Sequence, residues 1–493
     1  MSGGTVADRH VHPATVPLRF LKEAPSTLLG LPAAFAYVSD VGWTAILAFA
    51  GFAAAIAFLF HWIRWRRFRY GLGESEIVIE SGLFQRTRRS IPFARIQDVD
   101  IERGPLQRLF GLAKLRIETG GSGKDEGLLD SVTMAEADRV RAVVRSALAG
   151  PTSPAAPATQ AQASLRLIFA MDLARVFLSG VFNFSLIWIA GLFALLQAFD
   201  DWLPFDPYDP GRWVGLAGDR VIDRFSAGAI LMVLSVALVL GILTGIARTI
   251  SRDFGFTLSI EGAERFRRER GLFTRTEAVI PVGRVQLARV QTGPLRRALG
   301  WHQLFFQTLS AAREGGGHQS MAPMARDDEV DAVLAEQRGM YAPAHAMLAM
   351  VSSRHIVRAL LSSAAPPIAA ILVAAAISPL AWPLLAALPF IAVPALLERR
   401  FHLYALRDDF VFVARGVWRQ QLWIVPVAKI QSVRLSRNFL QRRLGLATLS
   451  IDTAGAPMVN APRIIDLRED KARALATQLT AAQLSGRKSG TDR

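Results

Sequence analysis

The stretch "RSIPFARIQDVDI" at residues 89–101 decides how this chain of 493 residues is interpreted, because it occurs in three versions. The other two read "VIPVGRVQLARV" at 279–290 and "IVPVAKIQSVRL" at 424–435. The alignment continues without gaps around this pattern, over residues 81–121, 270–310 and 415–455. The copies are unevenly spaced, which indicates a module present three times rather than a solenoid of fixed period.

The positions shared by the copies are two glycines, a proline, a basic residue and a glutamine. They are Gly82, Pro92, Arg95, Gln97 and Gly111; Gly271, Pro281, Arg284, Gln286 and Gly300; and Gly416, Pro426, Lys429, Gln431 and Gly445. A feature that recurs in every copy fits a folding requirement better than one shared active site. We therefore predict structural roles for these residues.

Each copy is predicted to be mostly strand, followed by one helix. "SEIVIESG" (75–82) alternates apolar and polar residues with the period of a half-buried strand. "RIQDVDIE" (95–102) alternates too, but its phase slips between Ile96 and Val99, which indicates a β-bulge. "TMAEADRVRAVVRSALA" (133–149) opens with a capping box and has one apolar face. This order predicts a small β-barrel or sandwich closed by its C-terminal helix.

Long apolar segments separate the copies. The chain is 51% hydrophobic, with a mean hydropathy of +0.28. A helix crosses a bilayer with roughly 20 mostly apolar residues. We predict six such spans in three hairpins, formed by residues 24–39, 43–63, 174–199 and 225–247 and by two spans within 359–397.

Basic residues gather at the ends of these spans. "RWRRFR" (64–69), "ARTISR" (247–252) and "RRFH" (399–402) follow the second, fourth and sixth span. Ends rich in Lys and Arg stay on the cytoplasmic side of a membrane. We therefore expect a multi-pass protein of the cytoplasmic membrane, with the N-terminus and all three modules in the cytoplasm. The net charge of +16 is then explained without nucleic acid.

The expected fold class is an α+β membrane protein in which each hairpin precedes one cytosolic module. The predicted order is an N-terminal segment and hairpin (1–63), module 1 (64–149), a linker (150–164), hairpin 2 (165–248), a divergent module 2 (249–340), hairpin 3 (341–398), module 3 (399–484) and a flexible tail (485–493).

Motifs for catalysis are missing from the sequence. The chain contains no cysteine, which excludes disulfides and thiolate chemistry. "ETGGSGKDEG" (118–127) does not satisfy the phosphate-loop pattern, and the eight histidines form no metal-ligand motif. We expect no catalytic residue, no cofactor and no metal site.

The basic side chains beside the modules are the candidate ligand contacts. Anionic lipid attracts a juxtamembrane Lys or Arg with about 1 kcal/mol each. The alternative is that these residues only fix the topology and solvate strand faces. The candidate headgroup contacts are Arg64, Arg66, Arg67, Arg69, Arg399, Arg400, Arg442 and Arg443. The run "RTRR" (86–89) lies beside them in the sequence.

With "GLFQRTRRSIPFARIQDVD", a "LQRLFGL" turn, "LRIETGG" and a final helix, the module resembles the bacterial pleckstrin-homology (PH)-like domain of the YdbS/YdbT membrane proteins. The resemblance implies a PH barrel, an integral membrane location and no enzymatic activity. It also implies a small YdbS-type membrane protein as a candidate partner. Membrane lipids and a second copy of the chain are the other partners considered.

The resulting functional hypothesis is a non-enzymatic membrane protein whose modules bind lipid headgroups or proteins, in envelope maintenance or stress resistance. The alternative is a lipid or small-molecule transporter in which the modules gate or scaffold the hairpins.

Overall fold

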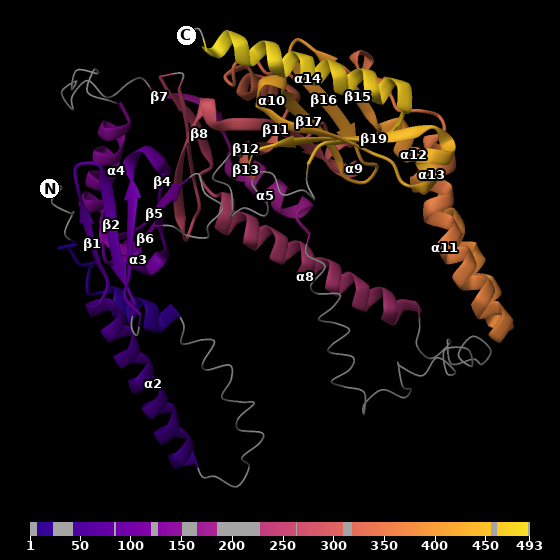
Figure 1. Ribbon diagram of the computed structural model, residues 1–493. Coiled ribbons are helices and arrows are strands. Elements are labelled where there is room, and N and C mark those ends of the chain that lie inside the picture. Colours follow the sequence, from indigo (N-terminus) through magenta and orange to yellow (C-terminus); the bar gives the residue numbers. More distant parts are fainter. Residues whose placement is uncertain are drawn as a thin grey trace.

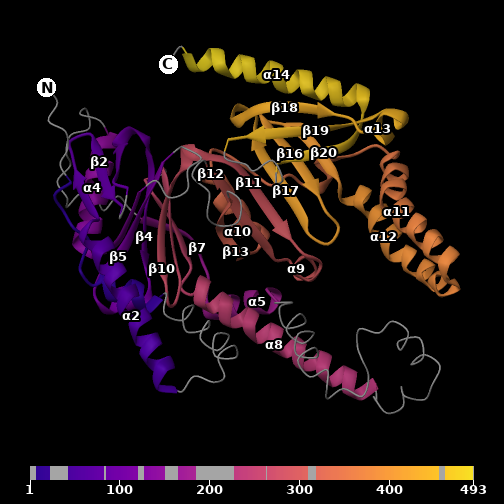
Figure 2. The same ribbon diagram turned by 60° about the horizontal axis from the view of Figure 1, so that its bottom comes forward.

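The computed structural model describes residues 7–22, 43–82, 85–119, 127–149, 165–184, 227–262, 264–308, 318–454 and 461–491. It is a row of antiparallel sheets, and the helices α2, α8 and α11 leave this row toward the same side (Figures 1 and 2). The chain is a mixed α/β protein with three PH-like modules.

Module 1 follows the helix α2. Its elements are α2 (Trp43–Arg66), β1 (Arg69–Leu72), β2 (Glu76–Ser81), β3 (Thr87–Pro92), η1 (Phe93–Arg95), β4 (Ile96–Arg103), α3 (Pro105–Leu109), β5 (Leu112–Thr119), β6 (Gly127–Thr133) and α4 (Met134–Ala149).

Module 2 repeats this order around two helices. Its elements are β7 (Leu165–Ala170), α5 (Leu173–Phe182), α8 (Ala227–Asp253), β8 (Thr257–Glu261), β9 (Arg265–Arg270), β10 (Arg275–Pro281), η4 (Val282–Arg284), β11 (Val285–Thr292), α9 (Pro294–Ala298), β12 (His302–Thr308), β13 (His318–Ala325) and α10 (Asp327–Ala335).

Module 3 ends the described chain. Its elements are η5 (His345–Met347), β14 (Ala349–Met350), α11 (His355–Ile377), η6 (Pro379–Ala387), α12 (Leu388–Phe401), β15 (Leu403–Arg407), β16 (Phe410–Arg415), β17 (Gln420–Pro426), η7 (Val427–Lys429), β18 (Ile430–Ser436), α13 (Phe439–Leu444), β19 (Leu446–Thr453), β20 (Arg463–Arg468) and α14 (Glu469–Thr491).

Neighbouring modules share their sheets. One sheet has the order β6-β5-β4-β10-β9-β8-β7, and the next has the order β13-β12-β11-β17-β16-β15-β14. Each therefore joins the second half of one module to the first half of the next. We call the β4–β10 pairing joint 1 and the β11–β17 pairing joint 2. The strands β1-β2-β3 and β18-β19-β20 form the two remaining sheets at the ends of the row.

These joints correct the expectation of a barrel in each module, since no closed barrel forms among the described strands. The strands β10 of module 2 and β17 of module 3 pair their outer edge with the preceding module, so neither can close a sheet with the last strand of its own module. The sheets instead pack face to face around shared apolar side chains. Phe412 and Ile424 of module 3 belong to the same buried cluster as Phe266 and Phe306 of module 2.

Both joints use the same register. Joint 1 pairs Ile101 with Glu277, Glu102 with Thr276 and Arg103 with Arg275. Joint 2 aligns the equivalent residues, pairing Val290 with Leu422, Gln291 with Gln421 and Thr292 with Gln420. The repeated sequence thus encodes a repeated way of joining modules, as well as a repeated module.

The apolar segments differ from the predicted six spans. By length and composition, two helices in the described part of the chain can cross a membrane, Ser235–Asp253 within α8 and His355–Ile377, which is α11. The segment predicted at 24–39 lies outside the described residues, and of 174–199 only the first part is described. The second half of 359–397 is divided into η6 and the 14-residue α12, both of which contain proline.

Each apolar segment starts and ends beside the same sheet. Arg9 bridges to Tyr70 of β1, so residues before α2 lie against module 1. In module 2, β7 pairs with β8. In module 3, β14 pairs with β15. The chain therefore returns to the side of the sheets from which it left.

Candidate anion-binding site

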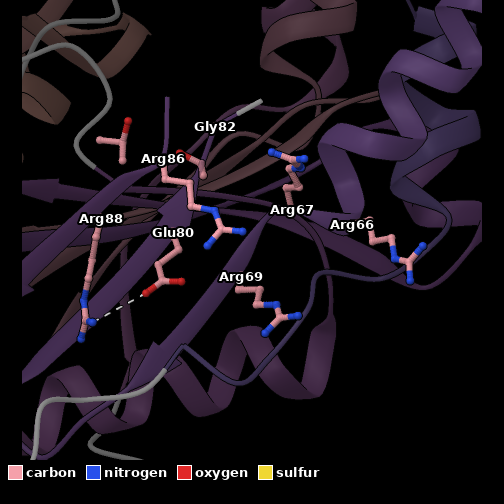
Figure 3. Close-up of a pocket in the computed structure, with 9 residues that line it drawn as sticks. Arg66, Arg67, Arg69, Glu80, Gly82, Arg86 and Arg88 are labelled. Carbon is pink, nitrogen blue, oxygen red and sulfur yellow. Dashed lines mark ion pairs between the residues drawn. The ribbon is translucent and has the colours of Figure 1, made fainter. Parts of the chain in front are cut away.

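A pocket with an excess of positive charge lies where α2 enters module 1. This arginine pocket has a volume of about 340 Å³ and opens to solvent. It is lined by Arg66, Arg67, Arg69, Glu80, Ser81, Gly82, Arg86, Thr87 and Arg88 (Figure 3). These residues come from the end of α2, from β1, and from the β2–β3 hairpin with its connecting turn.

Strand pairing assembles the pocket. The register places Arg69 of β1 opposite Glu80 of β2, and Glu80 opposite Arg88 of β3. Gly82 forms the turn between β2 and β3 at a φ of +129°. A Cβ at this position would lie 1.9 Å from the carbonyl oxygen of Gln85, so no other residue fits this turn without moving the backbone.

The pocket has an excess of positive charge. It contains five arginines and one carboxylate, a formal charge of +4 from five minus one. The ion pair between Arg88 Nη1 and Glu80 Oε1 is 3.8 Å long, and these side chains are 55% and 40% exposed. Such an exposed pair contributes little. Guanidinium groups bind phosphate and carboxylate through paired hydrogen bonds, so the pocket is suited to an anion with several oxygens.

In modules 2 and 3 the strands equivalent to β3 form the joints. Glu277 stands where module 1 has Arg88, and it pairs with Arg141 at 2.9 Å and with Arg267 at 3.1 Å. Leu422 stands at this position in module 3 and lies opposite Val290 of joint 2. The arginine at this outer-edge position thus occurs in module 1, whereas modules 2 and 3 have Glu277 and Leu422 there.

The structure unites only part of the predicted contact set. Arg66, Arg67 and Arg69 line the pocket, whereas Arg64 lies one turn earlier in α2 and does not. The other predicted contacts lie in module 3, Arg399 and Arg400 on α12 and Arg442 and Arg443 on α13. The run "RTRR" supplies Arg86 and Arg88, a contribution that only the β1–β2–β3 pairing reveals.

The motif residues lie at turns and joints. Gly82, Gly271 and Gly416 have φ values of +129°, +110° and +106°, and Gly111, Gly300 and Gly445 follow the short helices α3, α9 and α13 at φ near +65°. Pro92, Pro281 and Pro426 each precede a 3-10 turn. The register shifts at Gln97, Gln286 and Gln431, so each glutamine occupies a β-bulge.

The basic motif residue reaches the preceding module. Arg284 Nη2 donates to the carbonyl of Ile96 at 3.4 Å, and Lys429 Nζ donates to the carbonyl of Gly283 at 2.9 Å. Arg95 has no preceding module within the chain and is exposed. A second contact has its donor in the preceding module: Arg108 Nη1 of module 1 donates to the carbonyl of Leu272 in module 2 at 2.9 Å.

Comparison with known proteins agrees with this repeated architecture. The family model "Bacterial PH domain" matches residues 26–148, 209–340 and 351–483, which is more than half of the chain. The chain belongs to the bacterial PH domain family. No solved structure matches it.

Curated relatives of this bacterial PH protein are membrane proteins. The transmembrane protein YdbT of Bacillus subtilis is 26% identical over 328 residues, 63% of this chain and 63% of YdbT. The transmembrane protein YdbS of the same organism is 38% identical over 79 residues, 16% of this chain and 48% of YdbS. The chain thus spans less than two thirds of either relative, and it is a YdbT/YdbS-like membrane protein.

Proposed function

We propose that this protein is a non-enzymatic, multi-pass protein of the cytoplasmic membrane that binds anionic lipid headgroups in the arginine pocket. The observation that carries the proposal is the convergence of five arginines and one carboxylate at the end of α2. Above the pocket, α2 exposes a series of large apolar side chains, namely Phe49, Phe52, Ile56, Phe58, Leu59, Phe60 and Trp62.

These two features fit a single lipid molecule. Acyl chains would lie along the exposed apolar surface of α2, and the headgroup phosphate would reach the guanidinium groups at its end. Arg66 stacks over Trp62 with 5.6 Å between Cζ and the ring centroid, which links the apolar face to the pocket.

The pairings beside each apolar segment support placing all modules on one side of the membrane. Residues before and after α2 both contact module 1, and the same holds for β7 with β8 and for β14 with β15. Such closure requires an even number of crossings in each segment, as in three hairpins. The basic helix ends support a cytoplasmic location for this side. Envelope maintenance or stress resistance is the cellular role proposed with it.

Lipid binding is tested with the full chain in nanodiscs, using the double variant Arg86→Gln/Arg88→Gln. Retention of phosphatidylglycerol over phosphatidylcholine is measured by native mass spectrometry. At about 1 kcal/mol per charge, removing two charges weakens retention about 30-fold. Competition by inorganic phosphate separates recognition of a lipid from recognition of a free anion.

The matched control is Lys471→Gln/Arg473→Gln, which removes the same charge from exposed positions on α14. Equal losses in both double variants would contradict a specific pocket. Lipid or solute flux in reconstituted vesicles, unchanged by the pocket variant, would favour the transporter alternative.

A further inference from the structure

Exposed apolar side chains gather at the three short helices and at the turns that face them. Their exposed fractions range from 54% to 77%. We call this set the apolar rim, and it consists of Leu109, Phe110, Phe273, Leu295, Leu299, Trp418 and Phe439. The equivalent position in two modules is apolar and exposed in both, as with Phe110 and Leu299.

The first part of the rim lies at the end of α8. Arg108 of α3 binds the carbonyl of Leu272, and the amide of Leu272 donates to the carbonyl of Ser251 in the last turn of α8. These two hydrogen bonds place α3 and the turn that contains Phe273 beside the last turn of α8, an apolar helix that is long enough to cross a membrane.

The second part of the rim lies beside the apolar helices rather than beyond them. Arg296 of α9 is buried and donates to Asn183 Oδ1 at 3.1 Å, at the end of α5. The preceding turn of α5 packs on α8, since a Cβ at Gly180 would lie 2.5 Å from Ile246 Cα. Ile246 lies about 10 Å before the end of α8 at 1.5 Å per residue. Leu295 and Leu299 lie on the same short helix as Arg296. They are therefore at the height of the apolar part of α8 and not beyond its end.

The third part of the rim lies at the start of α11. Arg354, which precedes α11, donates from Nη1 to the carbonyl of Leu444 in α13 at 2.8 Å. Arg443 stacks over Phe439 of the same short helix, with 5.5 Å between Cζ and the ring centroid. Figure 1 shows α3, α9 and α13 on the side of the sheets from which the long helices leave, with α14 on the opposite side.

Apolar side chains interleaved with arginines, at the ends of membrane helices, match the chemistry of the headgroup and acyl boundary. We propose that the apolar rim inserts into this boundary, so that each joint rests on the bilayer and the modules are held at a fixed height. The proposal rests on the membrane location of the chain and is independent of the arginine pocket.

The test uses single cysteines, because the natural chain has none. Phe110→Cys, Leu299→Cys and Trp418→Cys are made one at a time in the full chain and labelled with bimane. The chain is reconstituted in phosphatidylglycerol and phosphatidylcholine nanodiscs that contain lipid with a nitroxide near the headgroup. These positions are exposed, so the substitutions leave the cores intact.

The expected result is loss of bimane fluorescence through lipid-borne nitroxide at all three rim positions. Thr477→Cys on α14 serves as the aqueous control, and Val239→Cys, exposed on α8, serves as the membrane control. Quenching by a water-soluble agent at the level of Thr477 would overturn the proposal. Protection from both quenchers would overturn it too, because the rim would then be covered by protein.

Discussion

Acidification to about pH 5 is expected to destabilise module 3 by about 2 kcal/mol through His402 alone. His402 follows α12 and is fully buried. The backbone N–H of Ile465 donates to its Nε2 at 3.3 Å, so this nitrogen acts as an acceptor and the ring is neutral. Burial, with the nearby Arg415 and His355, lowers the pKa of His402 to about 3.

The sign follows from the two pKa values of His402. Its pKa is about 6.5 in the unfolded chain. The unfolded chain therefore takes up a proton first as the pH falls, and the folded chain stays neutral until about pH 3. The neutral, buried His402 therefore costs no stability above the unfolded pKa. Stability is lost as the pH falls from the unfolded pKa toward the folded pKa. About pH 5 lies about 1.5 units below the pKa of the unfolded chain, so the free energy of unfolding falls by about 2 kcal/mol.

The measurement is urea unfolding of the full chain in detergent, followed by tryptophan fluorescence across this pH range. His402→Gln keeps an acceptor for the Ile465 amide and removes the titration, so it is expected to flatten the pH dependence. His345→Gln, at an exposed position, is the matched control. If the His402 and His345 variants show the same slope as the natural chain, the reasoning is refuted.

Three other substitutions test the turns, the joints and the ends of the row. Gly271→Ala places a Cβ 2.0 Å from the Thr274 carbonyl oxygen and is expected to lower the urea midpoint far more than Gly262→Ala, which meets no atom within 4 Å; equal shifts would contradict this. Glu277→Gln weakens one ion pair across joint 1, with Arg141, and one within module 2, with Arg267; it is expected to cost about 2 kcal/mol in unfolding, with an unchanged midpoint as the contrary result. If two copies of the chain paired head to tail in the common register, Arg434 of one copy would lie opposite Arg89 of the other. Arg89→Glu would replace this like-charge pair by an ion pair and is therefore expected to increase association of the chain. Native mass spectrometry measures this association, and no increase would contradict the prediction.

Local structure could be predicted from the sequence because local periodicity determines it. The alternation in 75–82 became β2, and the phase slip after Ile96 became the bulge at Gln97. The capping pattern at Thr133 became α4, with Thr133 Oγ1 accepting from the amide of Glu136. Turn glycines were recognisable because only glycine tolerates their φ values.

The joints could not be predicted in this way. Alternation shows which face of a strand is buried, but it does not show which neighbour occupies the edge. The eight residues of β11 are all buried, whereas most of the equivalent β18 is exposed, and the two sequences differ little in apolar content. The arginine pocket cannot be predicted from the sequence for the same reason. Arg69 and Arg88 are distant in the sequence and meet only through Glu80 of the strand between them.

The shared register of the two joints has a consequence for how such chains evolve. A deletion that removes module 2 with its hairpin would bring β4 against β17. In the common register Ile101 would then lie opposite Leu422, an apolar pair that replaces Ile101–Glu277 and Val290–Leu422. In-frame duplication or loss of a hairpin with its module therefore yields new neighbouring strands that can pair in the existing register. Genes of this type can change length in whole repeats while keeping the register of every joint.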